Sequence, residues 1–323
     1  MKKSFLLLGL FSLILSSALF VSCDNDDDDN NEVVNPNIVE FASSDANFSI
    51  LVDAVVKAGL DDDLSSDGPL TVFAPTNAAF EAFLSAKGFA SLDDVPADVL
   101  AAILTNHVVA GRGASTDLSN GYVPSISATS FGSNIPTSLY INIDNGVTIN
   151  GTSKVTTADV EVSNGIIHVI DVVIDLPTVV TFAVSNPNFS SLVAALTASG
   201  NTIDFVSVLS GEGPFTVFAP TNDAFQALLD SNADWNSVND IPTAVLEEVL
   251  LYHVTDAGNV RSTDLSDGFT VPTLANESFT IDLTANPPVI NAFANTANIV
   301  ATDVQASNGV IHVIDSVIIP DLN

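Results

Sequence analysis

A ten-residue segment that occurs twice constrains the fold of this chain more than any other feature. Residues 71–80 read TVFAPTNAAF, and residues 216–225 read TVFAPTNDAF. In each copy a β-branched and aromatic strand end is followed by proline, which cannot continue a ladder, and then by Thr-Asn, which favours a helix N-cap. The segment therefore predicts a strand, a fixed corner and a helix that packs back. The residues that carry this interpretation are Phe73, Pro75, Thr76, Asn77, Phe218, Pro220, Thr221 and Asn222.

A second segment repeats at a similar distance: NGIIHVID at residues 164–171 returns as NGVIHVID at residues 308–315. Asn-Gly predicts a tight turn with positive φ, and the apolar run after it predicts a central, buried strand that contains His168 or His312. Both segments, duplicated in this order, resemble the two signature motifs of the fasciclin domain. The resemblance covers nearly all of residues 36–319.

The duplication divides most of the chain into two units, each of a size that can bury one hydrophobic core. We place their boundaries at residues 38–176 and 177–320. Helical patterns come early in each unit and short strands come late, which predicts an α+β fold in which a β-sandwich or open barrel has helices packed on one side. The fasciclin resemblance implies the same compact wedge.

The N-terminus has the pattern of an export signal. Lys2 and Lys3 precede an apolar run, and the only cysteine of the chain, Cys23, follows it. This predicts a signal peptide over residues 1–22 and a lipid on Cys23, and the segment resembles a bacterial lipobox with Phe20 where leucine is usual. An uncleaved membrane anchor is the alternative interpretation. Lipidation would leave no cysteine for a disulfide.

Residues 23–37 form an acidic stretch with few apolar side chains, which predicts a disordered tether. An acidic run after a lipidated cysteine resembles the surface-export signal of lipoproteins of the Bacteroidetes type. A plain solvated spacer is the alternative. The resemblance implies a lipid-anchored outer-membrane protein, either on the cell surface or at the periplasmic face.

The charge balance excludes one class of partner. All 39 acidic residues but only five of the seven basic ones follow Cys23, so the processed chain has a net charge of −34. Such a surface repels nucleic acid and anionic lipid headgroups. We therefore expect no nucleic-acid binding.

The four histidines fall into two equivalent pairs, His107 with His168 and His253 with His312. Two interpretations fit them: poor metal sites, or buried histidines that hydrogen-bond the backbone. The acidic segment at residues 61–68 lacks the closing Glu of a calcium loop, which leaves it as a solvated connection. The sequence contains no G-x-S-x-G motif, and its only cysteine is assigned to the lipid, so we expect neither enzyme activity nor a cofactor.

The fasciclin resemblance also implies candidate adhesion residues. In animal members, adhesion is attributed to an Asp-Ile pair before the second motif and to a Tyr-His pair at the end of the middle helix. An exposed carboxylate could complete the coordination of a cation on a receptor. The alternative is that each aspartate caps the turn into Asn-Gly. The matching residues here are Asp159, Val160, His107, Asp303, Val304, Tyr252 and His253, with Asn106 in place of the first tyrosine.

These observations lead to one functional expectation and one alternative. The first is a non-catalytic, membrane-anchored adhesion or interaction lipoprotein whose tandem domains bind an extracellular protein, a matrix polymer or another copy of the chain. The alternative is a glycan-capture accessory of a surface nutrient-uptake system, which would bind a polysaccharide.

Overall fold

The computed structural model describes residues 35–322. The predicted signal peptide, Cys23 and most of the predicted tether lie outside these residues. The helices of the first half are α1 (Ile38–Ser44), η1 (Ala46–Phe48), α2 (Ser49–Ala58), α3 (Asp61–Ser65), α4 (Asn77–Lys87), η2 (Leu92–Asp94) and α5 (Ala97–Thr105). Its strands are β1 (Leu70–Pro75), β2 (Val108–Ala110), β3 (Gly121–Thr129), β4 (Gly132–Asn142), β5 (Thr148–Ile149), β6 (Ser153–Val162) and β7 (Gly165–Ile170).

The second half repeats this order of elements. Its helices are α6 (Val179–Ser185), η3 (Pro187–Phe189), α7 (Ser190–Leu196), α8 (Phe205–Leu209), α9 (Asn222–Asp230), η4 (Val238–Asp240), α10 (Thr243–Tyr252) and η5 (Ser262–Asp264). Its strands are β8 (Phe215–Pro220), β9 (Val254–Thr255), β10 (Phe269–Pro272), β11 (Ser278–Asp282), β12 (Val289–Asn291), β13 (Thr296–Ala306) and β14 (Gly309–Ile314).

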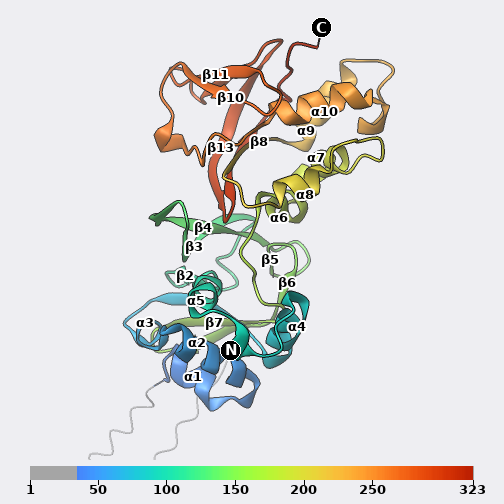
Figure 1. Cartoon of the computed structure of the whole chain (residues 1–323). Helices are drawn as coiled ribbons and strands as arrows, with labels where there is room; N and C mark the ends of the chain where they lie inside the picture. Colours follow the sequence, from blue (N-terminus) through green and yellow to red (C-terminus); the bar gives the residue numbers. More distant parts are fainter. Residues whose placement is uncertain (1–34, 323) are drawn as a thin grey trace, which may run out of the picture. The chain divides into compact units, whose positions relative to one another are not determined.

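Each half builds one seven-stranded sheet, and the two sheets have the same topology. Figure 1 shows the first half in blue to green and the second half in yellow to red. The order is β2-β1-β7-β6-β5-β4-β3 in the first and β9-β8-β14-β13-β12-β11-β10 in the second. Helices such as α2, α4 and α5 supply apolar side chains to the core beside the sheet of the first domain. The predicted α+β class is therefore confirmed, as is the internal duplication.

The strand, corner and helix predicted from the first repeated segment form as expected. Strand β1 ends at Pro75, and the Thr76 hydroxyl accepts a hydrogen bond from the Ala79 amide at 3.3 Å, which caps α4. Thr221 caps α9 through Ala224 at the same distance. A capping hydroxyl satisfies a helix N–H that has no partner within the helix. The threonine is thus the cap in both domains.

The asparagine that follows each threonine has a different role. The Asn77 side chain accepts a hydrogen bond from the Ile50 amide at 2.9 Å and donates one to the Ala46 carbonyl at 2.8 Å. It therefore ties the start of α4 to the start of α2. Asn222 makes the equivalent bonds in the second domain, with the Ser191 amide and the Pro187 carbonyl.

The strands β7 and β14 are central and buried, as predicted. Strand β7 pairs in parallel with β1 and antiparallel with β6, and the register sets His168 beside Phe73. Their rings are stacked with centroids 5.5 Å apart, and Phe218 and His312 repeat this contact at 5.4 Å. Both faces of β7 are buried, since Ile167 belongs to one core cluster and Ile170 to another, and this explains its continuous apolar sequence.

The turn before each of these strands differs from the prediction. Neither Asn164-Gly165 nor Asn308-Gly309 adopts positive φ. Glycine is required there for space instead, because a Cβ on Gly165 would lie 2.1 Å from the Leu70 carbonyl oxygen. The prediction of a positive-φ turn was wrong, since the close approach of β1 selects glycine without a left-handed backbone.

Two predicted loop segments are also corrected. The acidic segment at residues 61–68 was expected to be a solvated connection, but its first five residues form α3, which buries Leu64. The predicted tether ends earlier than residue 37, because the Pro36 carbonyl accepts a hydrogen bond from the Ser163 amide at 3.0 Å and Asn37 caps α1. A helix that buries Leu64 and hydrogen bonds to Pro36 and Asn37 therefore order residues whose composition is typical of disorder.

The β3–β4 hairpin spans residues that carry no charge. Between residues 121 and 143 the chain has no Asp, Glu, Lys or Arg. Ser127 donates to the Ala102 carbonyl of α5 at 2.9 Å, which holds the hairpin on that helix. Ser138 accepts from the Gln305 amide at 3.0 Å, and Tyr122 accepts from Asn186 at 3.0 Å. The uncharged hairpin is thus a contact surface within the folded chain.

Within residues 35–322 no single helix is long and apolar enough to cross a membrane. Only α6 together with the η3–α7 segment, a pair bent by 99°, meets the criteria of length and composition.

Candidate functional site

The aspartates singled out by sequence lie at irregularities of strands β6 and β13. Asp159 has φ 61° and Asp303 has φ 60°, and the pairing of each strand with its neighbour shifts at this point. A left-handed residue inside a strand is costly for most side chains but is tolerated by aspartate. Each aspartate therefore marks a bulge that turns its carboxylate away from the regular strand.

The carboxylate at each bulge binds a serine from a segment more than 40 residues earlier in the chain. Asp159 accepts hydrogen bonds from the Ser115 amide at 2.7 Å and from the Ser115 hydroxyl. Asp303 accepts the same pair of bonds from Ser262, with the amide at 2.8 Å. These bonds lower the pKa of Asp159 below its usual range. The prediction that these aspartates cap the Asn-Gly turn was wrong, because their oxygens bind this loop.

The Asn-Gly turn is held by its own asparagine, a role that the sequence analysis missed. The Asn164 side chain accepts a hydrogen bond from the Ile38 amide at 3.0 Å and donates to the Leu64 and Ser66 carbonyls, each at 2.9 Å. Asn308 makes the three equivalent bonds in the second domain. The signal available in the sequence was the asparagine itself, repeated with the same neighbours.

The histidines at the ends of α5 and α10 join each helix to the segment after the last strand. The Ile174 amide donates to His107 Nε2 at 2.8 Å, so the ring proton is on Nδ1, which donates to the Ile103 carbonyl at 2.8 Å. His253 has the same arrangement with Ile318 and Val249. Burial lowers the pKa of each ring to about 4. Both histidines are therefore neutral at physiological pH.

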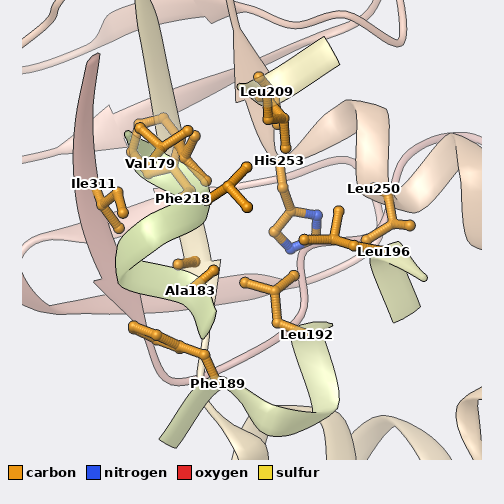
Figure 2. A pocket seen from close by; sticks show the side chains of 14 residues that line it. Val179, Ala183, Phe189, Leu192, Leu196, Leu209, Phe218, Leu250, His253 and Ile311 are labelled. Carbon is orange, nitrogen blue, oxygen red and sulfur yellow. The ribbon is translucent and has the colours of Figure 1, made fainter. Parts of the chain in front are cut away.

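The surroundings of His253 are almost wholly apolar. Figure 2 shows its ring in a small pocket beside Leu196 and Leu250. The side chain of His253 is 3% exposed, and that of the neighbouring Tyr252 is fully buried. His107 is equally buried in the first domain. A partner at the surface therefore cannot contact these three candidate adhesion residues in this conformation.

The other two histidines lie under the aspartate bulges. The Asp159 amide donates to His168 Nδ1 at 3.3 Å, and Nε2 donates to the Gly113 carbonyl at 2.8 Å. His312 Nε2 donates to the Val260 carbonyl at 2.9 Å, and burial lowers its pKa. Each of the four histidines thus binds at least one backbone group, and His312 Nδ1 is the one ring nitrogen among them that is buried without a hydrogen-bond partner. Among residues 35–322 no group of three or more His, Cys, Asp or Glu side chains is arranged to hold a metal ion.

Ser115, Asp159 and His168 have the composition of a hydrolytic triad but not its connectivity. In a triad the histidine lies between the nucleophile and the carboxylate, so that it can take the hydroxyl proton. Here the serine binds the carboxylate directly, and both ring nitrogens of the histidine are occupied by backbone groups. This cluster stabilises the bulge and cannot activate the serine.

Of the candidate adhesion residues, the first-domain pair is the more accessible. Asp159 is exposed and Val160 is half-buried. Asp303 is half-buried, and Val304 is only 4% exposed. If these positions contact a partner, the bulge of the first domain presents the larger surface.

Comparisons with known proteins agree with the duplication. The family model described as "Fasciclin domain" matches residues 46–177 and 187–320. Protein sll1483 of Synechocystis sp. is 41% identical over 145 residues, which cover 45% of this chain and 74% of that protein. Transforming growth factor-beta-induced protein ig-h3 of Sus scrofa is 30% identical over 263 residues, 80% of this chain and 36% of the relative.

Two further comparisons concern an animal protein and a solved structure. Human periostin is 28% identical over 275 residues, and these cover 81% of this chain and 30% of periostin. The chain therefore spans about a third of the length of ig-h3 and periostin. The structure of a FAS1 domain pair from the insect cell adhesion molecule Fasciclin I covers 84% of this chain and 95% of its own, with a TM-score of 0.53 and 24% identity. That likeness supports the shared fold.

Proposed function

This chain belongs to the fasciclin-domain family, and from that premise we propose that it is a non-catalytic adhesion or interaction protein. Its partner would be an extracellular protein, a matrix polymer or a second copy of the chain. One observation carries the proposal: in both domains, the aspartate at the bulge and the two histidines are held by hydrogen bonds to other groups of the fold. Such a molecule offers surfaces rather than a reaction centre.

The anchoring part of the proposal rests on sequence. We propose that Cys23 carries a lipid and that the acidic tether holds both domains away from an outer membrane, on the cell exterior. The net charge of −34 after Cys23 keeps such domains soluble and repels anionic surfaces. Two domains on one anchor also gain avidity, so each contact can be weak.

The test uses cells that display the full chain. We expect them to aggregate or to bind matrix-coated beads, and protease added to intact cells should release both domains. The Cys23→Ser variant should leave the membrane fraction and lose adhesion while it keeps its fold. Adhesion that is unchanged when the chain is absent from the surface would refute the proposal, and resistance to the protease would indicate the periplasmic face.

A second function, glycan capture for a surface uptake system, is favoured by one feature: an open groove with mixed polar and apolar walls, lined by α4 of the first domain and by Thr178 and Thr181 at the start of the second.

A further inference from the structure

An apolar groove of about 210 Å³ lies on the second domain, where helices α9 and α10 both line it. This volume is smaller than that of clefts that take a whole small molecule, roughly 300–1,000 Å³, so the groove suits one or two side chains of a larger partner. Its walls include Leu228 of α9, Val245 and Val249 of α10, Trp235 of the connection between these helices, and Ile319 and Leu322 after β14.

Most of these apolar side chains are accessible to solvent. Leu322 is 47% exposed, and Leu228, Trp235, Val245 and Ile319 are half-buried. Single exposed apolar residues are common on protein surfaces, but a gathered set of them marks a place where a partner can exclude water. The groove is therefore a candidate docking surface.

The equivalent wall of the first domain is charged. The residue that precedes each donates its amide to the helix-end histidine of its own domain, so Asp175 corresponds to Ile319. Asp175 binds Lys87 at 2.6 Å, and the Lys87 ammonium lies 5.9 Å from the centre of the Phe83 ring. Counted from the repeated segment, Asn232 corresponds to Lys87. The second domain has thus replaced both charges of this ion pair by uncharged side chains.

Acidic side chains border the apolar groove. Asp230, Asp234 and Glu248 each directly precede a residue that lines it. Both ion pairs among the described residues lie in the first domain, so neither neutralises these carboxylates. Arg261 is the only Lys or Arg after residue 176. The groove is therefore an apolar surface in a negative electrostatic field.

This combination of features selects among partners. A second copy of the chain would bring a net charge of −34 after Cys23, and an anionic membrane surface would be repelled in the same way. A basic segment with one apolar face complements both features, because its apolar side chains enter the groove while its lysines or arginines meet the carboxylates. An amphipathic helix presents such a face through residues spaced three and four apart.

We propose that this groove docks a cationic amphipathic helix of an extracellular protein. The inference deepens the proposed interaction function and rests on it. The apolar side chains of the partner helix would lie against Trp235 and Val245. The first domain would not share the site, because the Lys87–Asp175 ion pair places charges in the equivalent wall.

The test titrates the full chain with a synthetic helix of about 14 residues, built from leucine and lysine with every leucine on one face. We expect a stoichiometry of one in isothermal titration calorimetry. Trp235 is the only tryptophan of the chain, so its emission should shift to shorter wavelength when the peptide excludes water from the groove. Two control peptides carry the same residues in an order without an apolar face, or glutamate in place of lysine. Both should bind at least about tenfold more weakly.

Two variants make the groove polar without changing the charge of the chain. Val245→Gln and Leu322→Gln should each weaken binding of the leucine–lysine peptide by at least about fivefold. Val208→Gln is the matched control, because Val208 is a 46% exposed valine of α8 that does not line the groove. It should bind as the wild type does. Unchanged thermal unfolding of each variant shows that a loss of binding is not a loss of folding.

The outcomes separate this site from the proposed function. Equal binding of the peptide without an apolar face would show that charge alone attracts it and would overturn the groove. Equal binding of the glutamate peptide would overturn the cationic partner. Self-association of the chain in sedimentation, abolished by Leu322→Gln, would assign the groove to a second copy instead.

The cell assay gives a further distinction. Adhesion that persists in both Val245→Gln and Leu322→Gln would overturn this site while the interaction function stands. Failure of wild-type cells to adhere would refute the proposed function, and the peptide titration would still decide whether the groove binds a cationic helix.

Discussion

The two domains differ most clearly just before the histidine that ends the middle helix. In the second domain this residue is Tyr252, whose ring meets Phe279 edge to face at 5.7 Å and whose hydroxyl donates to the Ser278 carbonyl at 3.2 Å. In the first domain it is Asn106, whose side chain accepts from the Thr137 hydroxyl at 2.7 Å and donates to the Asp175 carbonyl at 3.1 Å. One domain fills the position with aromatic packing, and the other fills it with a hydrogen-bonded network.

The histidine that follows keeps the same bonds in each case, from its ring to one amide and one carbonyl. The threonine caps and the turn asparagines are equally unchanged. The two domains thus share the same bonds from side chains to backbone at the helix caps, the Asn-Gly turns and the helix-end histidines. The position before the histidine accepts either an apolar or a polar side chain, and the polar one, Asn106, has hydrogen-bond partners for both its oxygen and its nitrogen.

We expect the largest loss of stability on removing the buried phenylalanine of strand β1 or of strand β8. Comparing the two losses tests whether the two phenylalanines are equivalent. Both Phe73→Ala and Phe218→Ala remove a side chain that is 1% exposed, so each should lower the free energy of unfolding by about 3–5 kcal/mol. Phe218 also meets Phe279 edge to face at 5.0 Å, a contact worth about 0.5–1.5 kcal/mol. We therefore expect the larger loss at Phe218, measured by urea unfolding.

The control for this pair is Val184→Ala, because Val184 is 66% exposed. It should change stability by less than about 0.5 kcal/mol. If either phenylalanine variant unfolds at the midpoint of the parent, that strand is not in the core.

Acidification should lower the stability by a smaller amount, through the two histidines at the ends of α5 and α10. Burial lowers the pKa of His107 and of His253 to about 4, against about 6.5 in an unfolded chain. The folded state therefore binds fewer protons, and stability is lost as pH falls from about 6.5 toward 4. Each histidine should contribute a loss of about 3 kcal/mol over this window.

Many carboxylates titrate in the same pH range. The contribution of each histidine is therefore measured as the difference in stability between the wild type and a variant that lacks that histidine. Urea unfolding of the wild type is compared with His107→Gln and with His253→Gln between pH 7 and pH 4. Each variant should be less stable at pH 7 but should lose less stability on acidification. Parallel pH profiles for the variant and the wild type would contradict a buried, neutral ring. Because Asp175 favours the charged form of His107 only, the two domains need not lose identical amounts.

The sequence predicted the elements that follow from local residue patterns. It missed the features that depend on contacts between segments far apart in the chain. The strand before Pro75, the helix after Thr76 and the buried strand containing His168 follow from residue type and periodicity. The parallel pairing of β1 with β7 brings together residues almost a hundred positions apart, which no local pattern shows. That pairing explains why residue 165 is glycine: a side chain there would collide with the backbone of β1, whereas its φ is not positive.

The candidate site was predicted less well, for the same reason. Asp159 was found from its place before the second motif, but its partner Ser115 lies 44 residues earlier, in a loop with no pattern of its own. The burial of Tyr252 and His253 also depends on segments far along the chain, such as the strand that supplies Phe279. Sequence identified the residues, and only the fold shows which of them reach the surface.

We expect the smallest loss of stability on removing the serine hydroxyl from either of the two serine–aspartate contacts. Ser115→Ala and Ser262→Ala each remove a hydroxyl that donates to a carboxylate and keep the amide bond. Because Asp159 is exposed and Asp303 is half-buried, solvent replaces the lost bond more fully in the first domain. The loss of stability should be below about 1 kcal/mol for Ser115→Ala and larger for Ser262→Ala.

A carboxyl titration sharpens this last comparison. The Ser115 bonds hold the pKa of Asp159 low, so their stabilising contribution is present at neutral pH and is lost as pH falls through that lowered pKa. In Ser115→Ala the pKa of Asp159, followed by NMR of its carboxyl carbon, should rise toward its ordinary value. An unchanged pKa would mean that the Ser115 amide alone holds the carboxylate. The serine hydroxyl would then be free to meet a partner at the most exposed of the candidate adhesion positions.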